Sequence, residues 1–315
     1  MGWQEIKCGD IMMTFINSGI FDLHTDMGMY VKQKHTTDIK PLIKLQQQSQ
    51  TNISVFSACC ERNHQRDELM TMIEMLDKAI SDNQITKVTN DKSLALNTQR
   101  AMMGIEGLGA IDRINDINYL YDKGVRVASL CWNDTNALAS GSDDNKQGLT
   151  DFGKDVIKRM EQVGMIIDVS HANEQSFWDI INNSNQPLLA THSNAYQLCN
   201  HNRNLKDEQL KIIAERGGII GCVSHAYFID KSRDVHLDVL VKHIKYIGDL
   251  IGYNHVALGF DFPEYYTDHQ DQHFNVGSAD LIIEVMNKQG ISPRDIQQII
   301  YDNAFNFFKN NLNNN

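Results

Sequence analysis

Residues 148–171 read GLTDFGKDVIKRMEQVGMIIDVSH, a segment whose hydrophobic pattern changes period halfway along. Its first part, residues 151–163, has the spacing of an amphipathic helix, and Gly164 suits the left-handed position that ends many helices. The apolar run at residues 165–170 is typical of a buried strand, and it ends at His171. A helix, a glycine and a buried strand in this order predict one unit of an α/β fold.

The same alternation extends over most of the chain. Seven more apolar runs predict strands at Gly19–Asp26, Ile53–Cys59, Ala101–Glu106, Val125–Trp132, Pro187–His192, Gly218–Ser224 and His255–Asp261. Helical periodicity recurs at Asp67–Ile80, Lys206–Glu215, Leu237–Ile251 and Pro293–Lys309. Eight strands separated by helices predict a TIM-like (β/α)8 barrel, and a doubly wound open sheet is the alternative that the same alternation permits.

The composition narrows the possible classes of protein. A chain of 315 residues fits one barrel domain over 1–315, in which we expect 1–12 to be a poorly ordered extension and 310–315 a frayed tail. The net charge of −11, without a concentrated run of Lys and Arg, argues against nucleic acid as a partner. No apolar stretch approaches the roughly 20 residues that span a bilayer, so we expect no membrane partner and a cytoplasmic protein.

Polar groups able to bind metals or protons stand where the predicted strands end. They are His24, Asp26, Cys59, Glu106, Trp132, His171, His192, His225 and Asp261. In a barrel the C-terminal ends of all strands converge on one mouth, so residues distant in sequence would meet there. This placement favours the barrel over the open sheet.

Five of these residues form a candidate metal-ligand set. His24 and Asp26 share one face of a strand, although Asp26 could instead cap the next segment. Glu106 follows an apolar run, where burial without a partner would be costly, and its alternative is an exposed loop position. With His171 and His192, the set suits two divalent ions, most simply zinc, bridged by Glu106.

Two further residues are candidates for handling the substrate. Asp261 could move a proton to or from water, or it could merely cap a helix. Arg203 lies in a polar loop, where its guanidinium could hold a carboxylate at two points or could simply be solvated.

Several blocks of the sequence resemble the renal, or membrane, dipeptidases and their bacterial relatives, which are zinc dipeptidases on a (β/α)8 barrel related to amidohydrolases. The matching blocks are FDLHTD at 21–26, GIEG at 104–107, residues 148–171, THSNAYQLCNHNRNLKD at 191–207 and GFDF at 259–262. The resemblance implies hydrolysis of dipeptides, including those with a D-residue at the C-terminal side. It also implies a homodimer as a common assembly.

The resemblance assigns a role to each candidate. It implies that His24 and Asp26 bind one metal, that His171 and His192 bind the other, and that Glu106 bridges both and is catalytic. It further implies that Arg203, which is followed by Asn204, holds the terminal carboxylate of the substrate. Asp261 is implied to lie beside the water that reacts.

Two departures from the family pattern affect the expected chemistry. Trp132 occupies a position where many members have a substrate-polarising histidine, and tryptophan offers only an indole N–H as a donor. His225 is the candidate substitute for that histidine. Pro263 and Glu264 also replace two of the family's loop residues, an aspartate and a glycine, which motivates another amide or a lactone as alternative substrate. A non-catalytic ligand-binding barrel is the third alternative.

Overall fold

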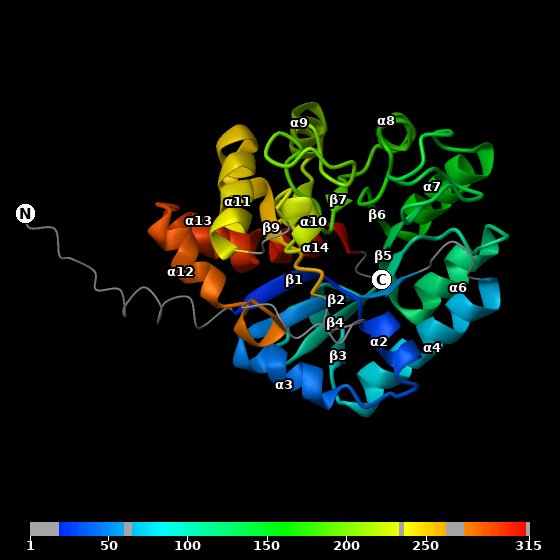
Figure 1. Ribbon diagram of the computed structural model, residues 1–315. Coiled ribbons are helices and arrows are strands. Elements are labelled where there is room, and N and C mark those ends of the chain that lie inside the picture. Colours follow the sequence, from blue (N-terminus) through cyan, green and yellow to red (C-terminus); the bar gives the residue numbers. More distant parts are fainter. Residues whose placement is uncertain (1–18, 60–64, 233–235, 263–273, 313–315) are drawn as a thin grey trace, which may run out of the picture.

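The computed structural model describes residues 19–59, 65–232, 236–262 and 274–312. Eight parallel strands form a ring in which β1 pairs with both β2 and β9, so the sheet closes on itself (Figure 1). The strands of the ring are β1 (Ile20–Thr25), β2 (Thr51–Cys59), β4 (Arg100–Glu106), β5 (Val125–Ser129), β6 (Ile166–Asp168), β7 (Leu189–Ala190), β8 (Ile219–Cys222) and β9 (Val256–Leu258). The predicted (β/α)8 barrel is therefore confirmed, and the open sheet is excluded.

A ninth strand, β3 (Thr86–Lys87), lies outside the ring and was not predicted. It pairs with Arg100 and Ala101 at the start of β4. The barrel neighbour β5 joins β4 only from Met103 onward, so β3 occupies the edge that β5 leaves open. A strand of two residues carries no detectable periodicity, which is why β3 could not be predicted from the hydrophobic pattern.

Helices surround the strands on the outside of the barrel (Figure 1). They are α2 (Met27–Gln33), α3 (Lys40–Gln48), α4 (Arg66–Asp82), α5 (Asp91–Leu94), α6 (Asn115–Lys123), α7 (Asp151–Val163), α8 (Glu174–Asn183), α9 (Asp207–Glu215), α10 (Ala226–Ile229), α11 (Leu237–Ile251) and α12 (Leu281–Lys288). Gly164 ends α7 with a φ of 83°, as its position in the sequence predicted. Within the described ranges, no helix combines the length and the apolar character needed to cross a membrane.

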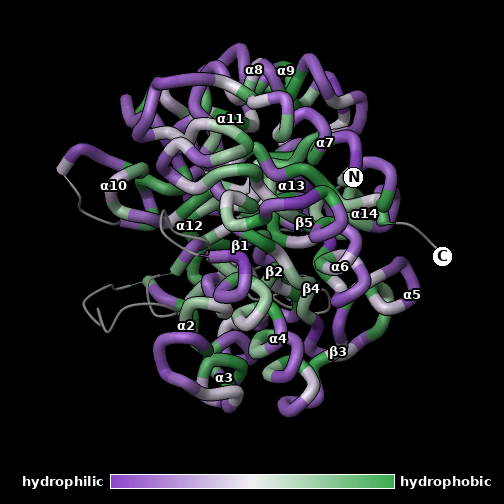
Figure 2. The backbone as a smooth tube through the Cα atoms, turned by 90° about the vertical axis from the view of Figure 1, so that its right-hand side faces the viewer, coloured by the Kyte–Doolittle hydropathy of each residue, from purple (hydrophilic) through white to green (hydrophobic). Residues whose placement is uncertain are grey.

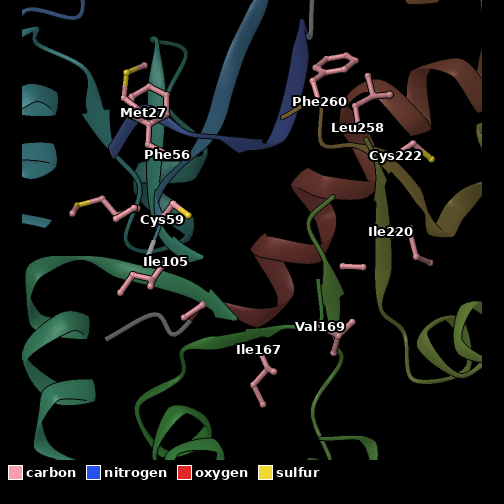
Figure 3. Close-up of a cluster of buried hydrophobic side chains, with 14 of the residues drawn as sticks. Met27, Phe56, Cys59, Ile105, Ile167, Val169, Ile220, Cys222, Leu258 and Phe260 are labelled. Carbon is pink, nitrogen blue, oxygen red and sulfur yellow. The ribbon is translucent and has the colours of Figure 1, made fainter. Parts of the chain in front are cut away.

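The hydrophobic core has two layers because successive strand residues point to opposite faces. Phe56, Ile105 and Ile167 belong to the outer layer between strands and helices, part of which Figure 3 shows. Phe21 and Met102 belong to the inner layer, which fills the barrel. Hydrophilic stretches lie mainly on the outer turns of the chain (Figure 2).

The C-terminal segment closes the end of the barrel where the strands begin. Pro293–Lys309 was predicted as one helix; it consists of α13 (Pro293–Gln297), a π-helical turn (Gln298–Asp302) and α14 (Asn303–Asn311). Phe308 of α14 stacks on Phe21 of β1, with ring centroids 5.4 Å apart. Helix α14 thus runs two residues further than expected, into the predicted tail, while 313–315 and the predicted extension at 1–12 lie outside the described residues.

Two glycines allow close packing just below the mouth of the barrel. A Cβ atom on Gly221 of β8, or on Gly259 directly after β9, would collide with the backbone oxygen of Thr191. The short strand β7 can therefore lie close to its neighbours, and this placement brings His192 into the mouth.

Candidate metal centre

The five predicted ligands meet at the C-terminal mouth of the barrel. His24 belongs to β1 and Asp26 follows it, Glu106 ends β4, and His171 and His192 follow β6 and β7. All five side chains are buried, and Glu106 is only 4% exposed, so it is not the solvated loop residue that the sequence left as an alternative. Residues from four strands thus form one cluster, as the convergence of strand ends predicts.

Glu106 lies at the centre of the cluster. Its Oε1 atom is 2.5 Å from Nε2 of His171 and 3.1 Å from Nε2 of His192. The other oxygen, Oε2, lies on the side of His24, 3.8 Å from its Nε2 atom. The two oxygens of one carboxylate therefore face different histidines, which is the arrangement that a bridging ligand requires.

The His24 side of the cluster contains two buried atoms without a hydrogen bond in the described part of the chain. They are Nε2 of His24 and Oδ1 of Asp26, which lie 3.4 Å apart. Unsatisfied buried polar atoms are rare in native proteins, and a bound metal ion would satisfy both of these. Candidate ligand atoms converge in two groups, His24 with Glu106 and His192, and His24 with Asp26 and Asp261.

Hydrogen bonds behind the cluster orient two of the imidazoles. Nδ1 of His171 lies 2.7 Å from Oδ1 of Asn133, and Nδ1 of His192 lies 2.8 Å from Oγ1 of Thr191. Thr191 in turn donates to Asp168, so its oxygen is free to accept from His192. Both bonds assign the proton to Nδ1 and leave Nε2 as the candidate ligand atom. Groups around a metal site commonly orient its histidines in this way.

The sequence analysis missed these outer residues. Asp168 could have been found from the sequence, because it is a carboxylate inside the apolar run 166–169. Like Glu106, it would be costly to bury there without a partner. No comparable signal marks Asn133, because it is a polar residue in a polar loop.

The electrostatics of the cluster favour a bound cation. Burial raises the pKa of Asp26 to about 6, with a contribution from the charge on Glu106. Burial would lower the pKa of His24, yet Glu106 and Asp26 raise it to about 10. The pKa of His171 falls to about 4, because burial and then the charge on Arg203 disfavour its protonated form. Glu106 and Asp26 thus favour a positive charge at His24, and a divalent ion could supply that charge in place of the proton. The neutral imidazole of His171 suits the same ion, and these groups exclude neither zinc nor its neighbours in the series.

Two residues of the mouth adopt a backbone conformation that non-glycine residues seldom take. His171 has a φ of 68° and Asp261 a φ of 53°. Such conformations cost free energy and cluster at functional sites, where the surrounding structure enforces them. Asp261 follows β9, is 8% exposed and lies in the mouth, and it caps none of the described helices.

A cavity of about 490 Å³ opens directly onto the cluster. Its walls include Asp26, Glu106, Trp132, Asn133, His171, Arg203, His225, Tyr227, Phe228 and Asp261. Trp132 lies beside a predicted ligand, with its ring centroid 6.2 Å from that of His171. Pro263 and Glu264, which motivated the alternative substrates, lie outside the described residues.

Arg203 is buried in the wall of this cavity and is only 3% exposed, so it is not the solvated loop arginine of the alternative. Its Nη2 atom donates to the backbone oxygen of His192 at 3.0 Å, while Nε has no hydrogen-bond partner among the residues that the structure describes. A buried guanidinium with an unused donor is suited to bind a carboxylate.

Asn204, which the sequence predicts as a substrate-binding residue beside Arg203, is buried in the same loop. Its amide group donates to the backbone oxygens of Cys199 and Phe228, both at 2.8 Å. Among the described residues it lines a second cavity of about 120 Å³, which shares His171 and Arg203 with the larger one. These contacts give Asn204 a part in shaping the loop that carries Arg203.

A closed (β/α)8 barrel with histidines and carboxylates gathered at its C-terminal mouth defines a metal-dependent hydrolase. The chain belongs to the membrane dipeptidase family, peptidase family M19, whose sequence profile matches residues 11–315. It is therefore a hydrolase of the metallopeptidase class, in a family that acts on dipeptides with the help of divalent metals.

Several known proteins are similar to this chain in sequence or in fold. An uncharacterized protein in the pqqA 5' region of Klebsiella pneumoniae is 34% identical over 238 residues, which cover 72% of this chain and 85% of the relative. An amidohydrolase from Pseudomonas aeruginosa has a similar fold, with a TM-score of 0.83, 20% identity and coverage of 96% of this chain and 99% of its own. A metallo peptidase from Rhodobacter sphaeroides, liganded with a phosphinate mimic of the dipeptide L-Ala-D-Ala, has a TM-score of 0.82 and 18% identity. The match covers 93% of this chain and 99% of that protein.

Proposed function

We propose that this protein hydrolyses the peptide bond of dipeptides, using two zinc ions held by His24, Asp26, Glu106, His171 and His192. The observation that carries the proposal is one cavity whose walls contain Glu106, Asp261 and the buried Arg203. A carboxylate cluster for metals, a carboxyl group for proton transfer and a guanidinium for the substrate thus face the same space. Bound divalent ions supply Lewis acidity, which lowers the pKa of water and polarises a carbonyl group.

Asp261 is the group that we assign to proton transfer. Burial, and then the charge on Asp26, raises its pKa to about 6. A carboxyl group with a pKa near neutrality can take a proton from the attacking water and pass it to the leaving amine, because both forms are accessible at working pH. Its place beside Asp26, within the second group of candidate ligand atoms, supports this role.

Arg203 sets the length of the substrate in this proposal. Its guanidinium holds the free carboxylate of the second residue, so a longer peptide would have to place a further residue where that carboxylate binds. We propose tolerance of a D-residue at this end, in line with the L-Ala-D-Ala mimic bound to the Rhodobacter sphaeroides protein.

The test is a turnover assay with metal analysis of the same sample. Protein purified without chelator should contain about two zinc ions per chain and should release free amino acids from a panel of L,L and L,D dipeptides. Reconstitution with zinc, manganese or cobalt then identifies the metal that supports the fastest turnover. Absence of amino-acid release from every dipeptide, with each metal, would refute the proposal.

A second candidate keeps the metal centre but changes the bond that is cleaved. Trp132 lines the cavity beside His171, where it replaces the family's histidine. Its large apolar ring could favour an acylated amino acid, a cyclic amide or a lactone. Faster turnover of N-acyl amino acids than of dipeptides would select this candidate over the first.

A further inference from the structure

His225 is a histidine of the active-site cavity that belongs to neither group of candidate ligand atoms. It directly precedes α10, in the segment between β8 and β9, and lines the cavity together with Glu106 and Asp261. It therefore faces the space where the scissile bond must lie if the proposed function is correct.

The imidazole of His225 makes no hydrogen bond to any of the residues that the structure describes. Its Nδ1 atom is fully buried without a hydrogen-bond partner, and Nε2 has none among the described residues either. Other histidines of this region bond to the backbone: Nδ1 of His201 accepts from the N–H of Arg203, and His243 is bonded at both ring nitrogens. Because buried polar atoms are normally satisfied, a free imidazole in a cavity wall indicates a ligand group as the missing partner.

Aromatic neighbours hold the ring of His225 in one orientation. It stacks on Phe228 at a centroid distance of 4.7 Å and on Tyr227 at 5.4 Å. Phe228 also lies beneath the guanidinium of Arg203, 5.3 Å from its central carbon. His225 is thus placed relative to Arg203 through a shared ring, so a substrate anchored at one would meet the other in a defined position.

We propose that His225 is a catalytic residue that donates a hydrogen bond to the carbonyl oxygen of the scissile amide. The bond strengthens as that oxygen gains negative charge in the tetrahedral transition state. Burial lowers the pKa of His225, which favours the neutral imidazole, a donor through its single N–H. This proposal rests on the proposed dipeptidase function, and it places the donor after β8 instead of at Trp132 after β5.

The test compares His225→Ala, His225→Gln and the exposed His236→Ala as a matched control. We expect His225→Ala to lower kcat by about 100- to 1000-fold with little change in KM, since one transition-state donor is removed. The affinity for a phosphinate dipeptide analogue should fall by a similar factor, while metal content stays at the wild-type value. His225→Gln keeps an N–H donor and should recover part of the loss, and His236→Ala should match the wild type.

The outcomes separate the two proposals. An active wild type with unchanged kcat and phosphinate affinity in His225→Ala would overturn the role of His225 and leave the dipeptidase function intact. A wild type that cleaves no dipeptide would overturn the proposed function, and the role of His225 would fall with it. If His225→Ala does not fold, His225→Gln decides: a raised KM with unchanged kcat contradicts the proposal, and a lowered kcat with wild-type metal content supports it.

Discussion

Oγ1 of Thr191 lies 2.8 Å from Nδ1 of His192 and thereby determines which ring nitrogen faces the metal centre. The threonine is itself held by Asp168, so a carboxylate in β6 controls the orientation of a ligand that follows β7. Such outer-shell groups typically contribute a factor of about 10 to 100 in metal affinity.

Thr191→Val tests this relationship. Valine keeps the shape of the side chain but can neither accept from His192 nor donate to Asp168, so the other tautomer of the imidazole becomes accessible. We expect the affinity for zinc to fall by about 10- to 100-fold in a competition titration with a chelator. Thr71→Val on the exposed face of α4 is the control, and equal zinc affinity in both variants would contradict the assigned role of Thr191.

Glu106→Gln tests the bridging ligand. An amide is neutral and offers one acceptor oxygen, so it cannot serve two ions as a carboxylate can. We expect metal content to fall to at most about one ion per chain and turnover to fall by at least about 100-fold. Loss of a residue that binds the metal should reduce activity at least as much as loss of a residue that only orients such a ligand. Exposed Glu208→Gln should keep wild-type metal content, whereas two ions retained in Glu106→Gln would rule out bridging.

Arg203→Met tests recognition of the terminal carboxylate. The arginine also donates to the backbone of His192, so its loss will lower activity on every substrate to some extent. The informative quantity is the ratio of kcat/KM for a dipeptide to that for its C-terminal amide. We expect this ratio to fall by about 10- to 100-fold, as for loss of a charge-assisted hydrogen bond. An unchanged ratio would mean that Arg203 does not contact the carboxylate.

His243 predicts a pH dependence of stability that is separate from the metal centre. This fully buried residue of α11 accepts from the backbone N–H of Ala195 at 3.1 Å and donates to the backbone oxygen of Ile229 at 2.9 Å. Burial lowers its pKa, so below about pH 6.5 the unfolded chain takes up a proton that the folded protein does not. Stability should therefore fall as the pH drops through 6.5, by up to about 1.4 kcal/mol per unit.

His243→Gln supplies the comparison for that pH effect. Glutamine can accept and donate at the same two positions but does not titrate in this range. Urea unfolding with a chelator present should give curves of stability against pH that diverge between wild type and variant below pH 6.5. Parallel curves would show that His243 does not contribute to the acid sensitivity.

The sequence predicted the positions of the candidate metal ligands because each lies at or just beyond the end of an apolar strand, where a polar group needs a reason to be buried. His171 and His192 are found in this way, and their convergence follows from the barrel topology alone. The bond between Asn133 and His171 could not be predicted, since it joins loops 38 residues apart and depends on how each loop turns. Likewise, no hydrophobic pattern distinguishes the free His225 from the fully bonded His243.

The stacking of Phe308 on Phe21 has a consequence for the order in which the protein can fold. The first strand of the barrel needs β9 as a neighbour and α14 beneath it, and both come from the opposite end of the chain. During synthesis, β1 must therefore wait with one edge and its inner face uncovered until nearly all of the polypeptide has emerged. Such dependence on distant contacts slows folding and leaves exposed strand edges prone to aggregation, so we expect the nascent chain to benefit from a chaperone.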